Sequence, residues 1–139
     1  MSRLTDGIWT ESSLAINEAP EEQRHTTPKH GIRLVILESP YAGDVQQNIE
    51  YARRCLADCL RRGEAPFASH LLYTQPGVLD DAVPAERRLG IEAGLAWGDR
   101  AHVTVCYIDR GITPGMQQGI DRALDSGRPI EFRTIVREQ

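Results

Sequence analysis

The stretch IRLVIL at residues 32–37 decides the fold of this chain. It is short, rich in β-branched residues and almost continuously apolar, which is typical of a strand buried on both faces of a parallel sheet. A loop at residues 38–43 follows, and Asp44 can cap the helix after it. That helix is expected to end at Gly63, and its apolar positions are spaced by three and four residues: Val45, Ile49, Ala52, Leu56 and Leu60.

Beyond Gly63 the sequence alternates between further strands and helices. The expected elements are, in chain order, a short strand at residues 64–69 that Pro66 weakens, a loop at residues 70–82, a helix from Pro84 to about Trp97, a strand at residues 101–108, a loop at residues 109–114, a helix at residues 115–126 and a strand at residues 129–136. Gly90 and Gly94 are unfavourable inside a helix, which indicates close packing on the sheet or backbone contact with a ligand. The alternation predicts a single-domain α/β fold of the Rossmann- or flavodoxin-like kind, with a mostly parallel sheet of four to five strands and helices on both faces.

The ends of the chain differ in character. Residues 31–139 carry the α/β pattern, whereas residues 1–30 keep no apolar period and are predicted to form an N-terminal arm. Trp9, Leu14 and Ile16 can pin that arm onto the domain or onto a second subunit of a homo-oligomer. Disorder of the arm is the alternative.

Composition and charge exclude several classes of function. The chain has 139 residues, of which 16 are Lys or Arg and 20 are Asp or Glu, so its formal net charge of −4 argues against binding of a nucleic acid polymer. Its apolar runs are far shorter than the roughly 20 residues that a bilayer requires, so we expect no membrane span and a cytoplasmic protein. The 3 cysteines, an odd number, suit a reducing compartment rather than a disulfide framework.

Ligands of parallel α/β sheets bind beyond the carboxyl ends of the strands, which brings three predicted loops together. The first loop offers Ser39, Tyr41 and the backbone around Gly43 at a helix N-terminus, where an anion is favoured. An ordinary strand-to-helix turn is the other interpretation.

The second loop contains His70 and Tyr73, which can contact a base or a sugar. His70 can also carry a proton, or it is a structural histidine. Cys55 and Cys59 lie on one helix face without a matching ligand pair elsewhere, so they are interpreted as buried apolar residues and neither a metal nor a cofactor is predicted.

The third loop combines a carboxylate, a hydroxyl group and two glycines ahead of a helix, as a pocket for an anion or a sugar requires. Its candidate ligand-binding residues are Asp109, Thr113, Gly115 and Met116. A glycine-rich connection capped by the carboxylate is the alternative. Charged residues on the second helix, residues 86–88 and Glu92, can reach over this region or form a solvated helix face.

Three segments resemble the nucleoside 2-deoxyribosyltransferase-like superfamily, in particular its small phage and bacterial members of unassigned function. They are LVILESPYAGDVQQNIEYARRC, FASHLLYTQPGVLDD and ERRLGIEAGLAWGDRAHVTVCYIDRGITPGMQQGIDRALDSGRPIEFR, and they lie within residues 33–133. The resemblance implies that Ser39, Pro40, Tyr41 and Gly43 match the first loop of the family, that Asp109 contacts the sugar or base, and that Thr113 and Gly115 lie beside phosphate or sugar.

In this superfamily a glutamate attacks the anomeric carbon of a nucleoside or nucleotide and cleaves its N-glycosidic bond. A carboxylate suits that work because it neutralises an oxocarbenium-like transition state and can hold the sugar covalently. The resemblance puts the place of this glutamate at Gly119, so the present chain departs from the family there. Asp121 lies two residues past that place, about 200° further around the helix.

The missing nucleophile leaves three functions open. The first is a hydrolase or transferase of the N-glycosidic bond that uses a displaced carboxylate. Its candidates are Glu38, Glu86, Glu92 and Asp109, or a carboxylate supplied by a second subunit. The second is a non-catalytic protein that binds a nucleotide derivative as a sensor or by sequestration. The third is a subunit whose role is assembly. In the first two, the partner is a nucleoside, a nucleotide or a related ribosyl compound.

Overall fold

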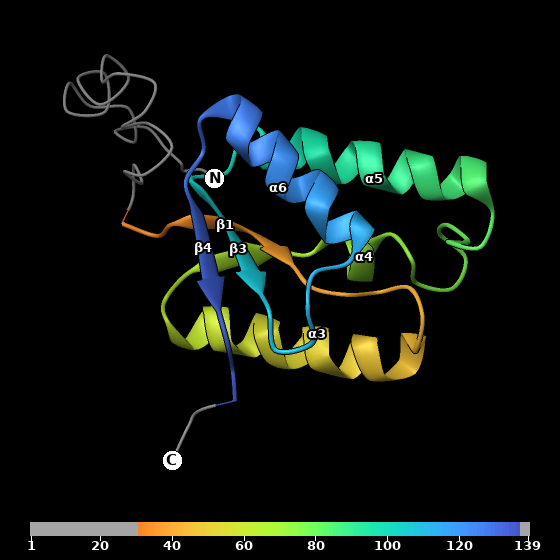
Figure 1. Ribbon diagram of the computed structural model, residues 1–139, viewed down its shortest axis with the longest axis horizontal. Coiled ribbons are helices and arrows are strands. Elements are labelled where there is room, and N and C mark those ends of the chain that lie inside the picture. The colour runs from red at the N-terminus through yellow and green to blue at the C-terminus, as the bar shows by residue number, and fades with distance from the viewer. Residues whose placement is uncertain (1–30, 137–139) are drawn as a thin grey trace, which may run out of the picture.

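The computed structural model describes residues 31–136, and within them four strands form one fully parallel sheet in the order β2-β1-β3-β4 (Figure 1). The elements are, in chain order, β1 (Leu34–Glu38), α3 (Val45–Arg61), β2 (Ala65–Phe67), α4 (Ser69–Leu72), α5 (Pro84–Gly98), β3 (Val103–Tyr107), α6 (Pro114–Ser126) and β4 (Ile130–Arg133). The predicted single-domain α/β fold with a parallel sheet is confirmed. The predicted N-terminal arm lies outside the described residues.

Helices cover both faces of the sheet, with α3 on one side and α5 and α6 on the other (Figure 1). On the α3 face the buried residues of β1 and β3 pack against that helix: Val35, Leu37, Val103, Val105 and Tyr107 contact Tyr51, Cys55 and Cys59. Because side chains alternate along a strand, Ile36, Glu38, Thr104 and Cys106 point to the opposite face. There Cys106 packs against Met116 and Ile120 of α6.

The strand order reverses between β1 and β3, which pair side by side in the centre of the sheet. Ile36 pairs with Thr104, and Glu38 pairs with Cys106 at the carboxyl end of both strands. Chain connections leave β1 towards β2 on one side and return to β3 on the other. In open α/β sheets this reversal creates the crevice in which ligands bind.

Three predictions differ clearly from the structure. The last strand ends at Arg133 rather than at residue 136, because the backbone N–H groups of Ile135 and Val136 donate to Asp109. The expected strand at residues 64–69 and loop at residues 70–82 contain the short helix α4, which begins at Ser69. One helical turn is too short to show a 3.6-residue period, so the sequence pattern could not reveal it. The buried face of α3 is also displaced, since Val45 and Leu60 are 37% and 62% exposed, while the caps at Asp44 and Gly127 are as predicted.

Gly94 explains how α5 can lie so close to α4. A Cβ atom at residue 94 would overlap the side chain of Ser69, and one at residue 90 would lie 3.2 Å from Leu79 Cδ1. Close packing therefore applies to both glycines, on α4 and on the following loop rather than on the sheet, while contact of their backbone with a ligand stays a prediction.

A cluster of four charged side chains joins the two edges of the sheet. Arg33 donates hydrogen bonds to Glu64 at 2.7 Å and to Glu131 at 2.8 Å. Arg133 donates to the same two carboxylates at 2.7 and 2.8 Å. Glu64 leads into edge strand β2, whereas Glu131 and Arg133 belong to edge strand β4.

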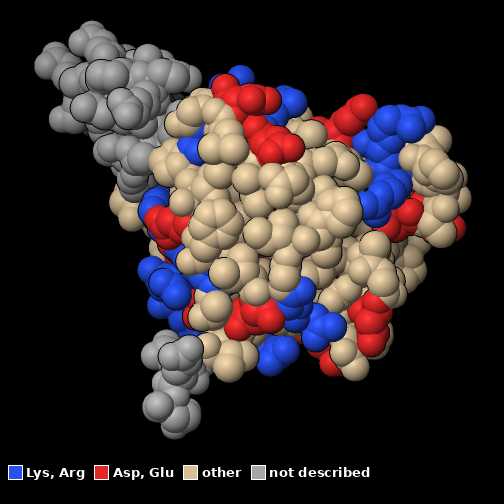
Figure 2. Space-filling view, viewed as in Figure 1, with Lys and Arg blue, Asp and Glu red and all other residues tan. Residues whose placement is uncertain are grey.

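The face seen in Figure 2 has no area of a single charge, because arginine side chains alternate with Asp and Glu around a largely uncharged centre. Exposed apolar residues such as Leu124 and Phe132 contribute to the uncharged surface of the protein. Among residues 31–136, none of the helices combines the length and the apolar character needed to cross a bilayer.

Candidate functional site

A cavity of about 370 Å³ lies at the carboxyl ends of β1 and β2, bounded by α4, α5 and the start of α6. The walls come from all three loops that the sequence predicted to meet. The residues that line it include Ile36, Glu38, Ser39, Tyr41, Ala42, Gly43, Phe67, Ser69, His70, Tyr73, Thr74, Leu79, Asp81, Glu86, Arg87, Gly90, Ile91, Gly94, Leu95, Thr113, Pro114, Gly115, Met116, Gln118 and Gly119. This size suits a small molecule such as a nucleoside.

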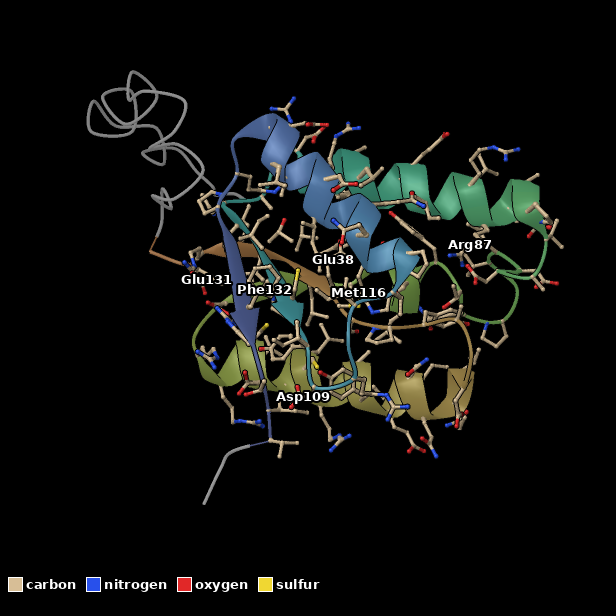
Figure 3. The ribbon with its side chains drawn as sticks, in the orientation of Figure 1. Glu38, Arg87, Asp109, Met116, Glu131 and Phe132 are labelled. Carbon is tan, nitrogen blue, oxygen red and sulfur yellow. The ribbon has the colours of Figure 1, made fainter. Side chains whose placement is uncertain are left out.

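Glu38 is the last residue of β1, and its side chain points towards α6 (Figure 3). The side chain borders the cavity but is otherwise surrounded by protein, and this burial raises the pKa of Glu38 to about 8, while the positive charge of Arg128 acts in the opposite direction. Removal of water disfavours the charged form of a carboxyl group. Glu38 is thus a carboxyl group that is mostly protonated at pH 7 and ionises near pH 8, a shift of the kind found at functional sites.

Gly119 of α6 faces the carboxyl group of Glu38 directly. A Cβ atom at residue 119 would overlap the Glu38 carboxyl group, with Oε1 only 3.1 Å away and the other two atoms closer still. The carboxyl group of Glu38 can therefore occupy this space only because residue 119 has no side chain.

Ser39 and His70 form a polar pair beside Glu38. Ser39 Oγ lies 2.7 Å from His70 Nε2. Burial lowers the pKa of His70 to about 4, so its imidazole ring is neutral at pH 7. A neutral ring accepts at one nitrogen and donates at the other, which allows the pair to hold a hydroxyl group of a ligand or a water molecule.

Charged groups stand on the α5 side of the cavity. Arg87 donates a hydrogen bond of 2.7 Å to Asp81. Its Nη2 atom would lie 3.7 Å from a Cβ atom at Gly115, so the guanidinium group faces the first turn of α6. In that turn Thr113 Oγ1 accepts a hydrogen bond of 3.2 Å from the backbone N–H of Met116. Arg87, paired with Asp81, and the capped first turn of α6 therefore lie close together at this end of the cavity.

Aromatic and aliphatic side chains make up another part of the wall. Phe67 lies edge-on to Tyr73, with 6.1 Å between ring centroids, and Tyr41, Ile91 and Leu95 add apolar surface. Such surfaces accept the flat face of a heterocyclic base.

Three predicted site residues do not line the cavity. Pro40 is a buried residue of the first loop, and Glu92 is exposed on α5. Asp109 lies beside α3, away from Glu38 (Figure 3), and accepts hydrogen bonds from Tyr51 Oη at 2.6 Å and from the backbone N–H groups of Ile135 and Val136. Through these hydrogen bonds the Asp109 carboxylate holds the segment after β4 in place. The position of Asp109 therefore gives no support to a contact with the sugar.

The other candidates do meet in one place: Glu38, Ser39, Tyr41, Gly43, His70, Tyr73, Thr113, Gly115 and Met116 all line the cavity. Glu86 and Arg87 also line the cavity. The sequence alone could not decide whether these charged residues reach the site or form a solvated helix face. Sequence reasoning missed Arg128, a buried cation beneath the cavity floor, because nothing in the local pattern of residues 127–129 marks it. Among the described residues, no three His, Cys, Asp or Glu side chains are arranged to hold a metal ion.

Comparisons with known proteins agree with this architecture. A 2-deoxyribosyltransferase from the psychrotolerant bacterium Bacillus psychrosaccharolyticus, described as a biocatalyst for the synthesis of nucleosides, is similar in structure, with a TM-score of 0.53, 18% identity and coverage of 76% of this chain and 75% of that chain. At this identity the likeness concerns the fold. A comparison with curated proteins gives no match. Residues 33–133 match a family described as a domain of unknown function (DUF7768), and the chain belongs to that family.

Proposed function

We propose that this protein cleaves the N-glycosidic bond of a nucleoside, a nucleotide or a related ribosyl compound, as a hydrolase or a transferase, with Glu38 as the nucleophile. The observation that carries the proposal is the carboxyl group of Glu38 against Gly119. The superfamily that the sequence resembles attaches its nucleophile at that position of the helix. Here a carboxyl group reaches the same space from β1.

The reaction needs one carboxylate and two displacements. An oxygen of the Glu38 carboxylate bonds to the anomeric carbon, the bond from that carbon to the base nitrogen breaks, and the electron pair leaves with the base, which takes up a proton. Water then attacks the anomeric carbon, the ester bond to Glu38 breaks, and the proton that the water loses balances the one that the base took up. In a transferase a second base replaces the water.

The rest of the cavity supports these steps. The aromatic wall at Tyr41, Phe67 and Tyr73 offers a surface for the base, and Ser39 with His70 offers polar atoms beside Glu38. Arg87 and the start of α6 would bind a phosphate of a nucleotide substrate. The structural relative acts as a deoxyribosyltransferase, which agrees with this class of reaction.

A second candidate function is the binding of a nucleotide derivative without turnover. It is favoured by the pKa of Glu38 near 8, because most Glu38 side chains are then protonated at pH 7 and donate a hydrogen bond to a ligand instead of attacking it.

A ligand screen followed by product analysis separates the two functions. Nucleosides, nucleoside monophosphates and diphosphates, and NAD-derived compounds are tested for an increase in Tm at pH 8, and each stabilising compound is then incubated with the protein and analysed for free base by chromatography. Release of base by the wild type and its loss in Glu38→Gln, with Glu92→Gln unchanged, supports the hydrolase or transferase. Stabilisation without release supports the binding protein.

A further inference from the structure

Arg128 lies beneath the cavity floor in the same layer of side chains as Glu38. It follows Gly127, the residue that ends α6, and its side chain turns back to the sheet, where Nε donates a hydrogen bond of 2.9 Å to Thr104 Oγ1. Thr104 pairs with Ile36, and Glu38 stands two residues further along β1. Residues two apart on a strand lie about 7 Å from one another on the same face. The guanidinium group therefore occupies the row directly below the carboxyl group.

Few polar contacts compensate for the loss of hydration of the Arg128 guanidinium group. Arg128 is 4% exposed, its Nη1 atom makes no hydrogen bond, and the nearest carboxylate oxygen, Oδ1 of Asp99, is 3.9 Å from Nη1. A Cβ atom at Gly98 would lie 3.4 Å from both Arg128 Nη2 and Ile36 Cγ1, so α5 closes over the group. A buried cation with an unsatisfied N–H group lowers the stability of the folded state. Arginine cannot reduce this cost by losing its proton, because its pKa is too high.

We propose that Arg128 is a positioning residue that acts through Glu38: its buried positive charge, one row below, favours the carboxylate form of Glu38 over the neutral acid. The catalytic role of Arg128 rests on the function proposed above, in which the carboxylate form of Glu38 attacks the anomeric carbon. Without a cation in this layer, an apolar environment would hold the proton on Glu38 more firmly.

The other titratable groups around Glu38 do not supply this charge. They are Cys106 from β3, His70 from α4, Asp81 from the loop after α4, Glu86 and Arg87 from α5, and Tyr41 and Tyr73 at the cavity wall. His70 is neutral at pH 7, and Arg87 is already bonded to Asp81 at 2.7 Å. The pKa of Glu38 is raised by burial and lowered by the charge of Arg128, in agreement with the geometry.

An NMR titration of the Glu38 carboxyl carbon tests the role of Arg128 without any need for activity. The full chain carries 13C-labelled glutamate, the Glu38 signal is identified by its loss in Glu38→Gln, and its midpoint is measured in the wild type, Arg128→Met, Arg128→Lys and Arg122→Met. Arg122 is the matched control because it also bonds Asp99, at 2.7 Å, but its side chain is 43% exposed. We expect the midpoint to rise by roughly one pH unit or more in Arg128→Met and to return most of the way in Arg128→Lys.

Equal midpoints in the wild type and Arg128→Met would overturn the role of Arg128, as would an equal rise in Arg122→Met. If Arg128→Met does not fold, Arg128→Gln keeps a donor for Thr104 and removes the same charge. Asp99→Asn works in the opposite direction, because it leaves Arg128 without its nearest anion and is expected to lower the midpoint.

The pH profile of base release supplies a second readout. In Arg128→Met the midpoint of kcat/KM should move to higher pH with the NMR midpoint, so that activity falls about tenfold at pH 7 and recovers in alkaline buffer. A purely structural role would reduce activity by the same factor at every pH. If the wild type releases no base at all, the proposed function fails, while the NMR titration still decides whether Arg128 controls the charge on Glu38.

Discussion

The carboxyl group of Glu38, carried by β1, fills the space that a side chain at Gly119 of α6 would need. The two residues belong to different elements, and their contact closes the floor of the cavity between the sheet and the helix. A carboxyl group can reach this space from the strand or from the helix, but both side chains cannot occupy it together. This mutual exclusion gives the absence of a carboxylate at residue 119 a structural reason.

Replacing Gly119 with alanine should displace the Glu38 carboxyl group while leaving the fold intact. The side chain of Glu38 is flexible at its far end and can swing away, and a misplacement of about 1 Å lowers a rate by roughly 100-fold. Alanine also favours a helix by about 1 kcal/mol over glycine, which offsets part of the crowding. Base release and the free energy of unfolding are measured in parallel.

The double variant Glu38→Ala/Gly119→Glu is the control for this experiment, since it moves the carboxyl group from the strand to the helix. Partial recovery of base release relative to Glu38→Ala is expected. A Gly119→Ala variant with wild-type activity would show that the position of the Glu38 carboxyl group is not critical.

The stability of the protein should fall as the pH rises from about 5 to about 8 because of Glu38. In the folded protein burial raises the pKa of Glu38 to about 8 from its ordinary value of 4.5. The folded state therefore binds one more proton than the unfolded state in this window, and the free energy of unfolding decreases by up to about 4 kcal/mol as that proton is lost. Urea unfolding of the wild type and Glu38→Gln at pH 5, 7 and 9 measures the difference. Parallel pH curves for the two proteins would contradict it.

His70 should produce a loss of stability in the acidic direction. Burial lowers its pKa to about 4 in the folded protein from the ordinary value of 6.5, so below pH 6.5 the unfolded state takes up a proton that the folded state does not. The free energy of unfolding then decreases by up to about 3 kcal/mol between pH 6.5 and pH 4. Thermal unfolding of His70→Gln should depend less on pH over this range, whereas Ser39→Ala, which keeps the histidine, should retain the acid sensitivity.

Replacing Asp109 with alanine should weaken the fold but leave ligand binding in place. The change removes the acceptor of Tyr51 Oη and of two backbone N–H groups after β4, which we expect to lower the free energy of unfolding by about 2 kcal/mol. The increase in Tm caused by a saturating ligand should stay the same as in the wild type. Loss of that increase in a folded Asp109→Ala protein would instead favour the contact with the sugar that the sequence resemblance implies.

The sequence predicts what local patterns determine. Asp44 and Gly127 mark helix ends through their own backbone chemistry, and the apolar run at residues 32–37 marks the central strand. The role of Asp109 in the fold depends on Tyr51 and Val136, which are distant in the sequence, so composition and spacing could not reveal it. Arg128 and the contact between Glu38 and Gly119 likewise arise only when the sheet and α6 come together.

The cluster of Arg33, Glu64, Glu131 and Arg133 has a mechanical consequence. Strands β2 and β4 lie at opposite edges of the sheet and share no backbone hydrogen bonds. The ion pairs of these four side chains nevertheless connect one edge to the other. These ion pairs oppose fraying of either edge strand alone, because separating β2 or β4 from the sheet breaks ion pairs that also involve the other edge. We therefore expect β2 and β4 to open together rather than separately, although no backbone hydrogen bond joins them.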